Sequence, residues 1–265
     1  MALAPRSTSS AYVNNASSIT VALPAGSVAG DLCILFAGHG YNVSGITAGW
    51  TTLDNSAGSN FNGATYVKTL VASDITAGNV TVNFGGAYYG WVALASFASP
   101  AGLVGVTAFL RDGSGAASRT ITTGAAAAIG DYALYFGSDR ANAAVTSSNG
   151  ASLQSNTANE ASGILAGLAV AAAGTLSNTF SYAGAPTGDY QAIVDVGPTA
   201  RNTYRIYDAG VEVMVQPLVK AKVYDVGVEV MVKPLVNAKI TNVGVEIMRS
   251  VAGATTRRRQ TFVTG

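Results

Sequence analysis

Histidine and cysteine are almost absent from this chain, which has one of each in 265 residues. A lone cysteine excludes a disulfide within the chain, and Cys33 stands in an apolar run that predicts a small buried side chain. His39 lies in the turn-like segment AGHGYN, without the nearby ligands that a zinc site needs. A Ser-His-Asp triad would have to use this histidine, and the chain has no G-x-S-x-G elbow to supply the nucleophile. We therefore expect no catalytic residue, no metal and no cofactor.

Charge is also scarce, since only 11% of the residues are charged. Such a composition is unusual for an intracellular enzyme and typical of rigid, Gly-rich β architecture. Residues 1–199 hold five basic and nine acidic groups, whereas residues 200–265 hold ten basic and five acidic groups. Glu160 is the only glutamate of the first part, which argues against a glycan-degrading enzyme with two facing carboxylates. The basic residues of the second part alternate with acids, so nucleic acid is not an expected partner.

No apolar segment approaches the length of about 18 residues that a membrane-spanning helix needs, so membrane insertion is not expected. The beginning of the chain, MALAPRSTSS, lacks the apolar core of a signal peptide, and we expect synthesis in a cytosol without export. Residues 1–17 are polar and rich in Ser and Asn, which predicts an N-terminal arm.

Short runs of Val, Ile, Thr, Tyr and Phe, bounded by Gly, Asn, Asp or Ser, follow one another from Ser18. They predict an all-β fold of the sandwich or barrel type. The plan then repeats about one hundred residues later: GDLCILFAG at Gly30 becomes GDYALYFGS at Gly130, and three further runs recur in the same order. We expect a duplicated, jelly-roll-like β-sandwich of about twelve strands over residues 18–199.

The halves of this sandwich are predicted at residues 18–99 and 119–197, joined by a link from Pro100 to Ala117. They could form one large sandwich or two small ones in tandem, and we favour a single compact unit. Asp31 and Asp131 precede matching strands and are expected to bind local backbone donors, with calcium ligation as the alternative.

Three 17-residue β repeats occupy residues 200–254, beginning at Arg205, Lys222 and Lys239. Repeats of this length indicate a stacked architecture, in which Pro217 and Pro234 carry the chain to the next strand. Alternation places one set of apolar residues on one face, and these are the candidate oligomer interface: Val211, Val213, Val215, Val228, Val230, Val232, Val245 and Ile247. The repeats would form either a shaft shared by several chains, which we favour, or a β-meander packed on its own domain.

Two other groups of residues are candidates for surface contacts. Trp50 and Trp91 lie in strand patterns and are expected in the core, whereas the aromatics of a Gly-rich turn are better placed to bind a ligand. The candidate surface-binding residues are Tyr41, Tyr88 and Tyr89. Residues 255–265 are predicted to form a basic tail, which is either solvated or docked on an acidic neighbour through Arg257, Arg258 and Arg259.

Three motifs carry a resemblance to a known family. The first motif is a strand that begins G-D-L/Y, found from Gly30 to Phe36 and from Gly130 to Phe136. It leads to the second motif, a G-W-T-x-L element at Gly49-Trp50-Thr51-Thr52-Leu53, and the third is a late strand, Gly90-Trp91-Val92-Ala93-Leu94. This pattern resembles the duplicated β-sandwich domains of tailed-bacteriophage structural proteins, and VYDVGVEVMV resembles the short repeats that end such proteins. The second half departs from the pattern, because Asn149-Gly150 stands where the Trp would be.

The resemblance implies a non-enzymatic virion structural protein, such as a fibre, spike, tail or capsid-decoration subunit. Its partners would be other copies of itself, with a trimer favoured, other virion proteins, and a host-surface glycan. The alternative function is a carbohydrate- or receptor-binding adhesin module that uses Tyr41, Tyr88 and Tyr89.

Overall fold

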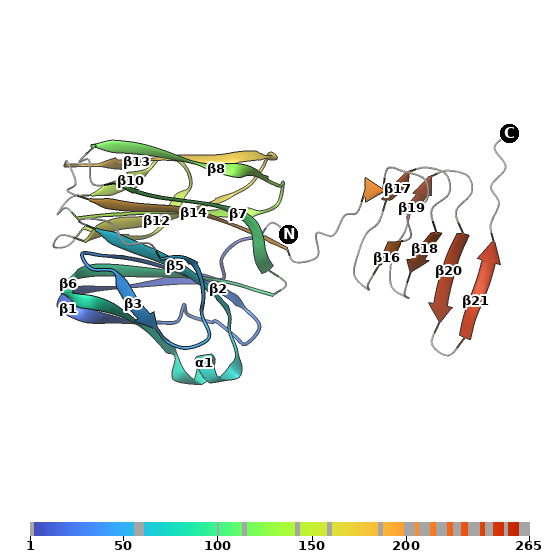
Figure 1. Cartoon of the computed structure of the whole chain (residues 1–265), viewed down its shortest axis with the longest axis horizontal. Helices are drawn as coiled ribbons and strands as arrows, with labels where there is room; N and C mark the ends of the chain where they lie inside the picture. The colour runs from blue at the N-terminus through green and yellow to red at the C-terminus, as the bar shows by residue number, and fades with distance from the viewer. Residues whose placement is uncertain are drawn as a thin grey trace. The chain divides into compact units, whose positions relative to one another are not determined.

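The structure is a computed structural model in which two compact units, residues 1–198 and 199–265, are each described by themselves. The described residues of the first unit are 3–55, 61–99, 101–112, 116–140, 144–157, 161–184 and 188–198. In the second unit they are the strands β15 (Arg205–Ile206), β16 (Val213–Val215), β17 (Lys222–Tyr224), β18 (Glu229–Val232), β19 (Lys239–Thr241), β20 (Glu246–Val251) and β21 (Ala254–Arg259). The predicted all-β class is confirmed (Figure 1).

The first unit contains two successive sets of strands. The first set is β1 (Ser7–Ala22), β2 (Leu32–His39), β3 (Val43–Ile46), β4 (Thr51–Asp54), β5 (Asn62–Thr69) and β6 (Asn79–Phe97), with the short helix α1 (Ala72–Ala77) before β6. The second set is β7 (Ala101–Asp112), β8 (Ser118–Ala127), β9 (Tyr132–Asp139), β10 (Val145–Ser147), β11 (Ala151–Asn156), β12 (Ser162–Ala169), β13 (Gly174–Tyr182) and β14 (Asp189–Pro198).

Strand pairing repeats in the two halves and confirms the duplication. β2 lies between β5 and β6, and β9 lies between β12 and β14 in the same antiparallel arrangement. The long strands β1 and β6 of the first half each correspond to two strands of the second half, β7 with β8 and β13 with β14. Each half is thus a sandwich with a five-stranded and a three-stranded layer, and the first half joins its layers through the bent strands β1 and β6.

The structure contradicts two predictions made from the sequence, the N-terminal arm and the link between the halves. Residues 7–17 are not an arm, because β1 begins at Ser7 and pairs with Ser96 of β6. Most of the expected link between the halves is also a strand, β7, which forms the edge of the second five-stranded layer by pairing with β14.

The central strands β2 and β9 are buried along their whole length because both of their faces pack against other layers. Alternate residues of β2 enter different cores. Cys33 and Leu35 pack between the two layers of the first half, whereas Ile34 and Phe36 pack in a core that the two halves share. This double burial explains why the sequence of these strands is a continuous apolar run.

The shared core places equivalent residues of the two halves against each other. Phe36 and Phe136 occupy the same place in β2 and β9, and their rings stack with centroids 5.1 Å apart. A Cβ atom at Gly63 would clash with the ring of Tyr190, and one at Gly163 with the ring of Trp91. Because each half provides a glycine beneath the other half's aromatic ring, the halves are related by an approximate two-fold axis. The single compact unit that the sequence favoured is therefore two sandwiches packed face to face.

Polar side chains hold the layer edges of the two halves together. Ser10 of β1 donates to Gln154 of β11 at 2.9 Å. On the opposite edge, Arg111 of β7 forms an ion pair with Asp54 of β4 and donates to the carbonyl oxygen of Gly63 at 2.8 Å. These contacts join the edge strands β1 and β11 on one side of the shared core and the edge strands β4 and β7 on the other.

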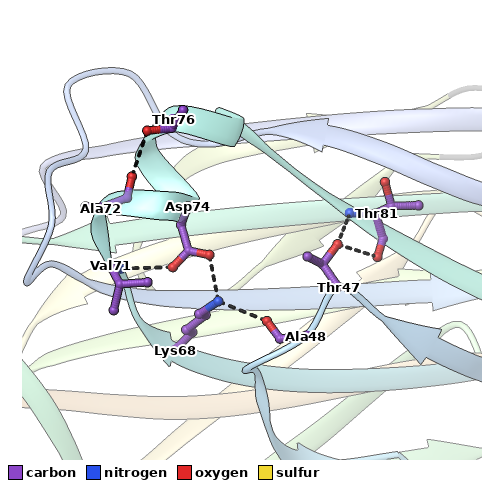
Figure 2. Close-up of polar contacts among 8 residues, drawn as sticks. All are labelled: Thr47, Ala48, Lys68, Val71, Ala72, Asp74, Thr76 and Thr81. Atoms are coloured by element: carbon purple, nitrogen blue, oxygen red, sulfur yellow. Dashed lines mark hydrogen bonds and ion pairs between the residues drawn. The ribbon is translucent and has the colours of Figure 1, made fainter.

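Helix α1 is fixed to the first half by the ion pair shown in Figure 2. Lys68 Nζ lies 2.6 Å from Asp74 Oδ1 and donates to the carbonyl oxygen of Ala48 at 2.9 Å, while Asp74 accepts from the backbone N–H of Val71 at 2.9 Å. The helix ends at Gly78, whose φ of 67° is the left-handed conformation that glycine adopts without strain.

A hydroxyl group fixes the segment after β3 to β6, as Figure 2 also shows. The backbone N–H of Thr81 donates to Thr47 Oγ1 at 2.9 Å. In the second half the N–H of Thr179 donates to Ser148 Oγ, also at 2.9 Å. The duplication therefore extends from the strand order to individual hydrogen bonds.

The second unit is a stack of parallel strands rather than a meander. β15, β17 and β19 pair in that order, and β16, β18 and β20 form a second parallel ladder, each with a shift of one 17-residue repeat. Val213, Val230 and Ile247 accordingly share one register position. The predicted stacking of the repeats is thus present within one chain.

Some predictions for this second unit lie outside the described residues. These are the interface positions Val211, Val228 and Val245 and the turn positions Pro217 and Pro234. Of the other interface positions, Val215 lies in β16 and Val232 in β18. The prediction that a tail begins at residue 255 is wrong for residues 255–259. Arg257, Arg258 and Arg259 belong to β21, which pairs antiparallel with β20.

Candidate functional site

The three tyrosines chosen from the sequence come from two neighbouring elements. Tyr88 and Tyr89 are not in a turn, because they lie within β6 near the bulges opposite Val13 and Ala16. Tyr41 follows β2 and is 45% exposed. The rings of Tyr41 and Tyr88 meet edge to face with centroids 6.1 Å apart, and those of Tyr88 and Tyr89 do so at 5.2 Å, while Tyr89 also packs against the core that the halves share. The structure thus groups Tyr41 and Tyr88 at the surface.

Backbone glycines and a guanidinium group hold these two rings in place. A Cβ atom at Gly40 would clash with the Tyr88 ring, and one at Gly86 would press on the Tyr41 ring. Arg140 of the second half lies over the Tyr88 ring, 4.7 Å from its centroid, and donates to the Tyr88 hydroxyl. A cation over an aromatic face is attractive, so this contact joins the halves and orients Tyr88.

His39 lies beneath this aromatic group and is fully buried. Its ring stacks on Phe84 with centroids 3.7 Å apart. The backbone N–H of Tyr41 donates to Nδ1 at 2.9 Å, which leaves Nε2 to donate to the carbonyl oxygen of Ala16 at 3.3 Å. Burial lowers the pKa of His39, so the neutral ring is favoured. These contacts give the chain's only histidine a structural role.

We expect the folded protein to lose stability as the pH falls through the ordinary imidazole pKa of about 6.5. The lowered folded-state pKa of His39 means that the unfolded chain binds its proton first, so protonation favours unfolding from this pH downward. Urea unfolding between pH 8 and pH 5 measures the effect. A His39→Gln variant should lose this part of the pH dependence. An identical pH profile for the variant would contradict the assignment.

The second half places a different polar group at the equivalent position. Asp139 corresponds to His39, and Tyr182 corresponds to Phe84, according to the strand registers. The Tyr182 hydroxyl and Gln191 Nε2 each donate to Asp189 Oδ2 at 2.9 Å, and Arg119 Nε lies 3.1 Å from the same oxygen. Burial raises the pKa of Asp189, and the bond from Tyr182 and the charge of Arg119 oppose that rise. Sequence reasoning missed this cluster.

Asp139 and Asp189 stand directly opposite each other in the β9–β14 register. Their exposed fractions are 0% and 1%, so neither presents a carboxylate at the surface. A hydrolytic pair must contact its substrate. The structure therefore places both carboxylates inside the second half.

The turn roles expected of Asp31 and Asp131 are confirmed. Asp31 Oδ2 accepts from the backbone N–H of Val28 at 3.0 Å, and Asp131 Oδ2 accepts from that of Ala128 at 2.8 Å. Within the described ranges, no group of three or more His, Cys, Asp or Glu side chains is arranged to hold a metal ion. Trp91 and Cys33 are buried as expected, whereas Trp50 is only partly buried.

Few charged side chains of the first unit are exposed among the residues that the structure describes. Among those that the structure describes, all are buried or half-buried except Arg6, which pairs with the buried Asp31 at 2.9 Å. The other exposed side chains that the structure describes in this unit are uncharged.

No helix in the described part of the chain has the length and apolar character to span a membrane. In comparisons with known proteins, no family model, no curated protein and no solved structure matches this chain.

Proposed function

We propose that the chain is a non-enzymatic structural component of a bacteriophage particle, such as a fibre, spike, tail or capsid-decoration subunit. Its second unit assembles copies of the chain, and its first unit is displayed. The proposed location is the virion, after synthesis in the host cytoplasm, and the partners are other copies and other virion proteins. The observation that carries the proposal is the parallel stacking of the three repeats in exact 17-residue register.

Stacked repeats favour assembly for a physical reason. A short solenoid presents backbone groups at the edges of its terminal rungs and side-chain rows along its faces, and both are surfaces on which further chains can pack. The resemblance to phage structural proteins, carried by strands such as Gly30 to Phe36, supports the same proposal. Burial of His39, Asp139 and Asp189 supports the non-enzymatic part, because these groups do not reach an external substrate.

Deletion of residues 199–265 tests the assembly role. The first unit contains its own three cores, so the truncated protein is expected to stay folded and to be monomeric. Circular dichroism checks the fold, and light scattering on a sizing column measures the molar mass. A truncated protein that assembles like the full chain would show that the repeats are not the assembly element.

A second candidate function, carbohydrate or receptor binding by the first unit, is favoured by the Tyr41 ring. This ring is 45% exposed and is held in one place by Gly86 and Tyr88, so it offers a rigid surface for stacking on a sugar. Glycan-array binding of the wild type, lost in a Tyr41→Ala variant but kept in a Leu168→Ala variant, would support it. Leu168 is similarly exposed, at 41%, and serves as the matched control.

A further inference from the structure

A hydrogen bond connects the buried His39 to the backbone of the exposed Tyr41. The backbone N–H of Tyr41 donates to His39 Nδ1 at 2.9 Å, and the carbonyl oxygen of Tyr41 lies 3.2 Å from the same nitrogen. Both backbone groups of Tyr41 are therefore within reach of one ring atom. Which of them bonds to the ring depends on whether Nδ1 carries a proton, because a bare ring nitrogen accepts and a protonated one donates.

The residues on either side of Tyr41 are held by groups that do not titrate. Asn62 Nδ2 donates to the carbonyl oxygen of Gly40 at 3.2 Å, and the backbone N–H of Gly85 donates to the carbonyl oxygen of Asn42 at 3.0 Å. These bonds fix the two ends of the segment from Gly40 to Asn42, whereas the bond at its centre depends on the histidine ring. A change in that ring should therefore turn the backbone of Tyr41 without unfolding β2 or β6.

A proton on His39 Nδ1 conflicts with the observed bond. In the imidazolium form both ring nitrogens are donors, so Nδ1–H would point at the N–H of Tyr41, and a buried donor without an acceptor is costly. The carbonyl oxygen of Tyr41 is an acceptor within reach of that proton. To use it, the backbone of Tyr41 has to turn, and this takes the Tyr41 ring away from its contacts with Gly86 and Tyr88.

The surroundings of His39 favour the neutral ring. The groups that face it come from its own segment, from three strands and from the second half: Tyr41 after β2, Phe84 and Tyr88 of β6, Ala16 of β1, Asn62 of β5, and Arg140, which lies over Tyr88. Among these groups only Arg140 is charged at neutral pH, and its positive charge opposes a second cation nearby. Burial acts in the same direction and lowers the pKa of His39.

We propose that His39 is the positioning residue of the Tyr41 surface, and that its protonation turns Tyr41 out of the orientation that binds a saccharide; this proposal rests on the binding function given above as the second candidate. The neutral ring holds the Tyr41 backbone through Nδ1, so the exposed Tyr41 ring stays against Gly86 and Tyr88. Because the pKa of His39 in the folded protein lies below the ordinary value of about 6.5, binding is complete at neutral pH and is lost only in acid.

The chain's single histidine makes the test direct, because one ring signal in the NMR spectrum of the untagged protein reports on His39 alone. The full-length protein is screened at pH 7.5 on an array of bacterial surface oligosaccharides, and the oligosaccharide bound most tightly is titrated at a series of lower pH values. Its Kd should rise about tenfold for each pH unit below the midpoint of the His39 signal, since only the fraction with a neutral ring binds. By linkage, a saturating amount of this oligosaccharide should move the midpoint to lower pH.

Two substitutions separate the positioning role from a merely structural one. His39→Asn places an amide oxygen where Nδ1 stands, so the N–H of Tyr41 keeps an acceptor that does not titrate, and binding should not change with pH. His39→Gln reaches instead toward the carbonyl oxygen of Ala16, so the N–H of Tyr41 loses its acceptor. If this variant holds Tyr41 in the binding orientation one tenth of the time, its affinity at pH 7.5 is about tenfold weaker than that of the Asn variant. Both changes remove the ring that stacks on Phe84, so they share the loss of packing.

Circular dichroism at each pH checks that the protein is folded. The proposal is overturned if the folded wild type binds the oligosaccharide equally above and below the midpoint of the His39 signal, or if that signal does not titrate before the protein unfolds. It is also overturned if a folded His39→Asn variant follows the pH profile of the wild type. Each of these results leaves the binding function standing. If no oligosaccharide binds the wild type at any pH, the binding function is removed, and this proposal with it. Should the variants fail to fold, the wild-type titration and the shift of its midpoint decide.

Discussion

A Phe136→Ala variant is expected to lower the free energy of unfolding by about 3–5 kcal/mol, the usual cost of removing a buried phenylalanine side chain. Phe136 is fully buried, stacks on Phe36 with centroids 5.1 Å apart and lies 5.2 Å from the Trp91 ring centroid. Both neighbours belong to the other half, so the change removes contacts between the two sandwiches. Urea unfolding monitored by tryptophan fluorescence measures the effect, because Trp91 reports on the shared core.

The control for this experiment is Leu168→Ala, in the same half but 41% exposed. A solvent-exposed leucine contributes little, and a change within about 0.5 kcal/mol is expected. Equal effects of the two substitutions would mean that the halves do not share a core at Phe136. A two-step transition in the Phe136→Ala variant would show in addition that this core makes the two sandwiches unfold together.

An Arg119→Met variant is expected to lose about 3–5 kcal/mol of stability at pH 7, because removing one partner leaves a buried charge without compensation. Methionine keeps most of the apolar stem, so the lost energy is mainly electrostatic. Arg119 Nε lies 3.1 Å from Asp189 Oδ2, and Asp139 stands opposite Asp189 in the register. Without the guanidinium group, the second half holds two facing carboxylates.

Lowering the pH should reduce the stability that the Arg119→Met variant loses relative to the wild type. Burial raises the folded-state pKa of Asp189, so its protonated form contributes stability that is present below the ordinary carboxyl pKa of about 3.9 and is lost as the pH rises through the folded-state value. Removing Arg119 makes the stability depend more strongly on protonation of Asp189. The difference in free energy of unfolding between the variant and the wild type should therefore become smaller as the pH falls from 7 to 4. The control is Arg6→Met, whose guanidinium is partly exposed and whose buried partner Asp31 keeps hydrogen bonds from the backbone N–H of Val28 and from the Ser96 hydroxyl, so a smaller loss of stability is expected. A gap for Arg119→Met that does not change with pH would contradict this account.

The duplication could be predicted because turns and strand order repeat in the sequence. Gly30 and Gly130 both adopt positive φ, 94° and 87°, at the turns before the central strands. The sharing of a core between the halves could not be predicted, because an apolar run such as β2 does not say which layer covers each face. The strand at residues 7–17 could not be predicted either, because its composition fits two structures. Polar Ser and Asn side chains suit a solvated strand edge as well as an arm, and pairing with β6 decides between them.

The candidate site was predicted only in part. Gly85-Gly86 predicts a turn at Tyr88 and Tyr89. Glycines inside a strand also accompany bulges and close contacts, however, and β6 is a strand of 19 residues that includes all four positions. Asp139 and Asp189 are fifty residues apart, and only the pairing of β9 with β14 brings them together. The aligned copies did contain a signal, since Asp139 stands where the first half has His39.

The molar mass of the full-length protein in solution, measured by light scattering on a sizing column, tests the central claim most directly. We expect a closed oligomer, with three copies favoured, because the stacked repeats offer strand edges on which neighbouring chains can pack. A protein that stays monomeric at high concentration and low salt would contradict assembly through the repeats. In that case the binding function of the first unit, centred on Tyr41, would become the leading proposal.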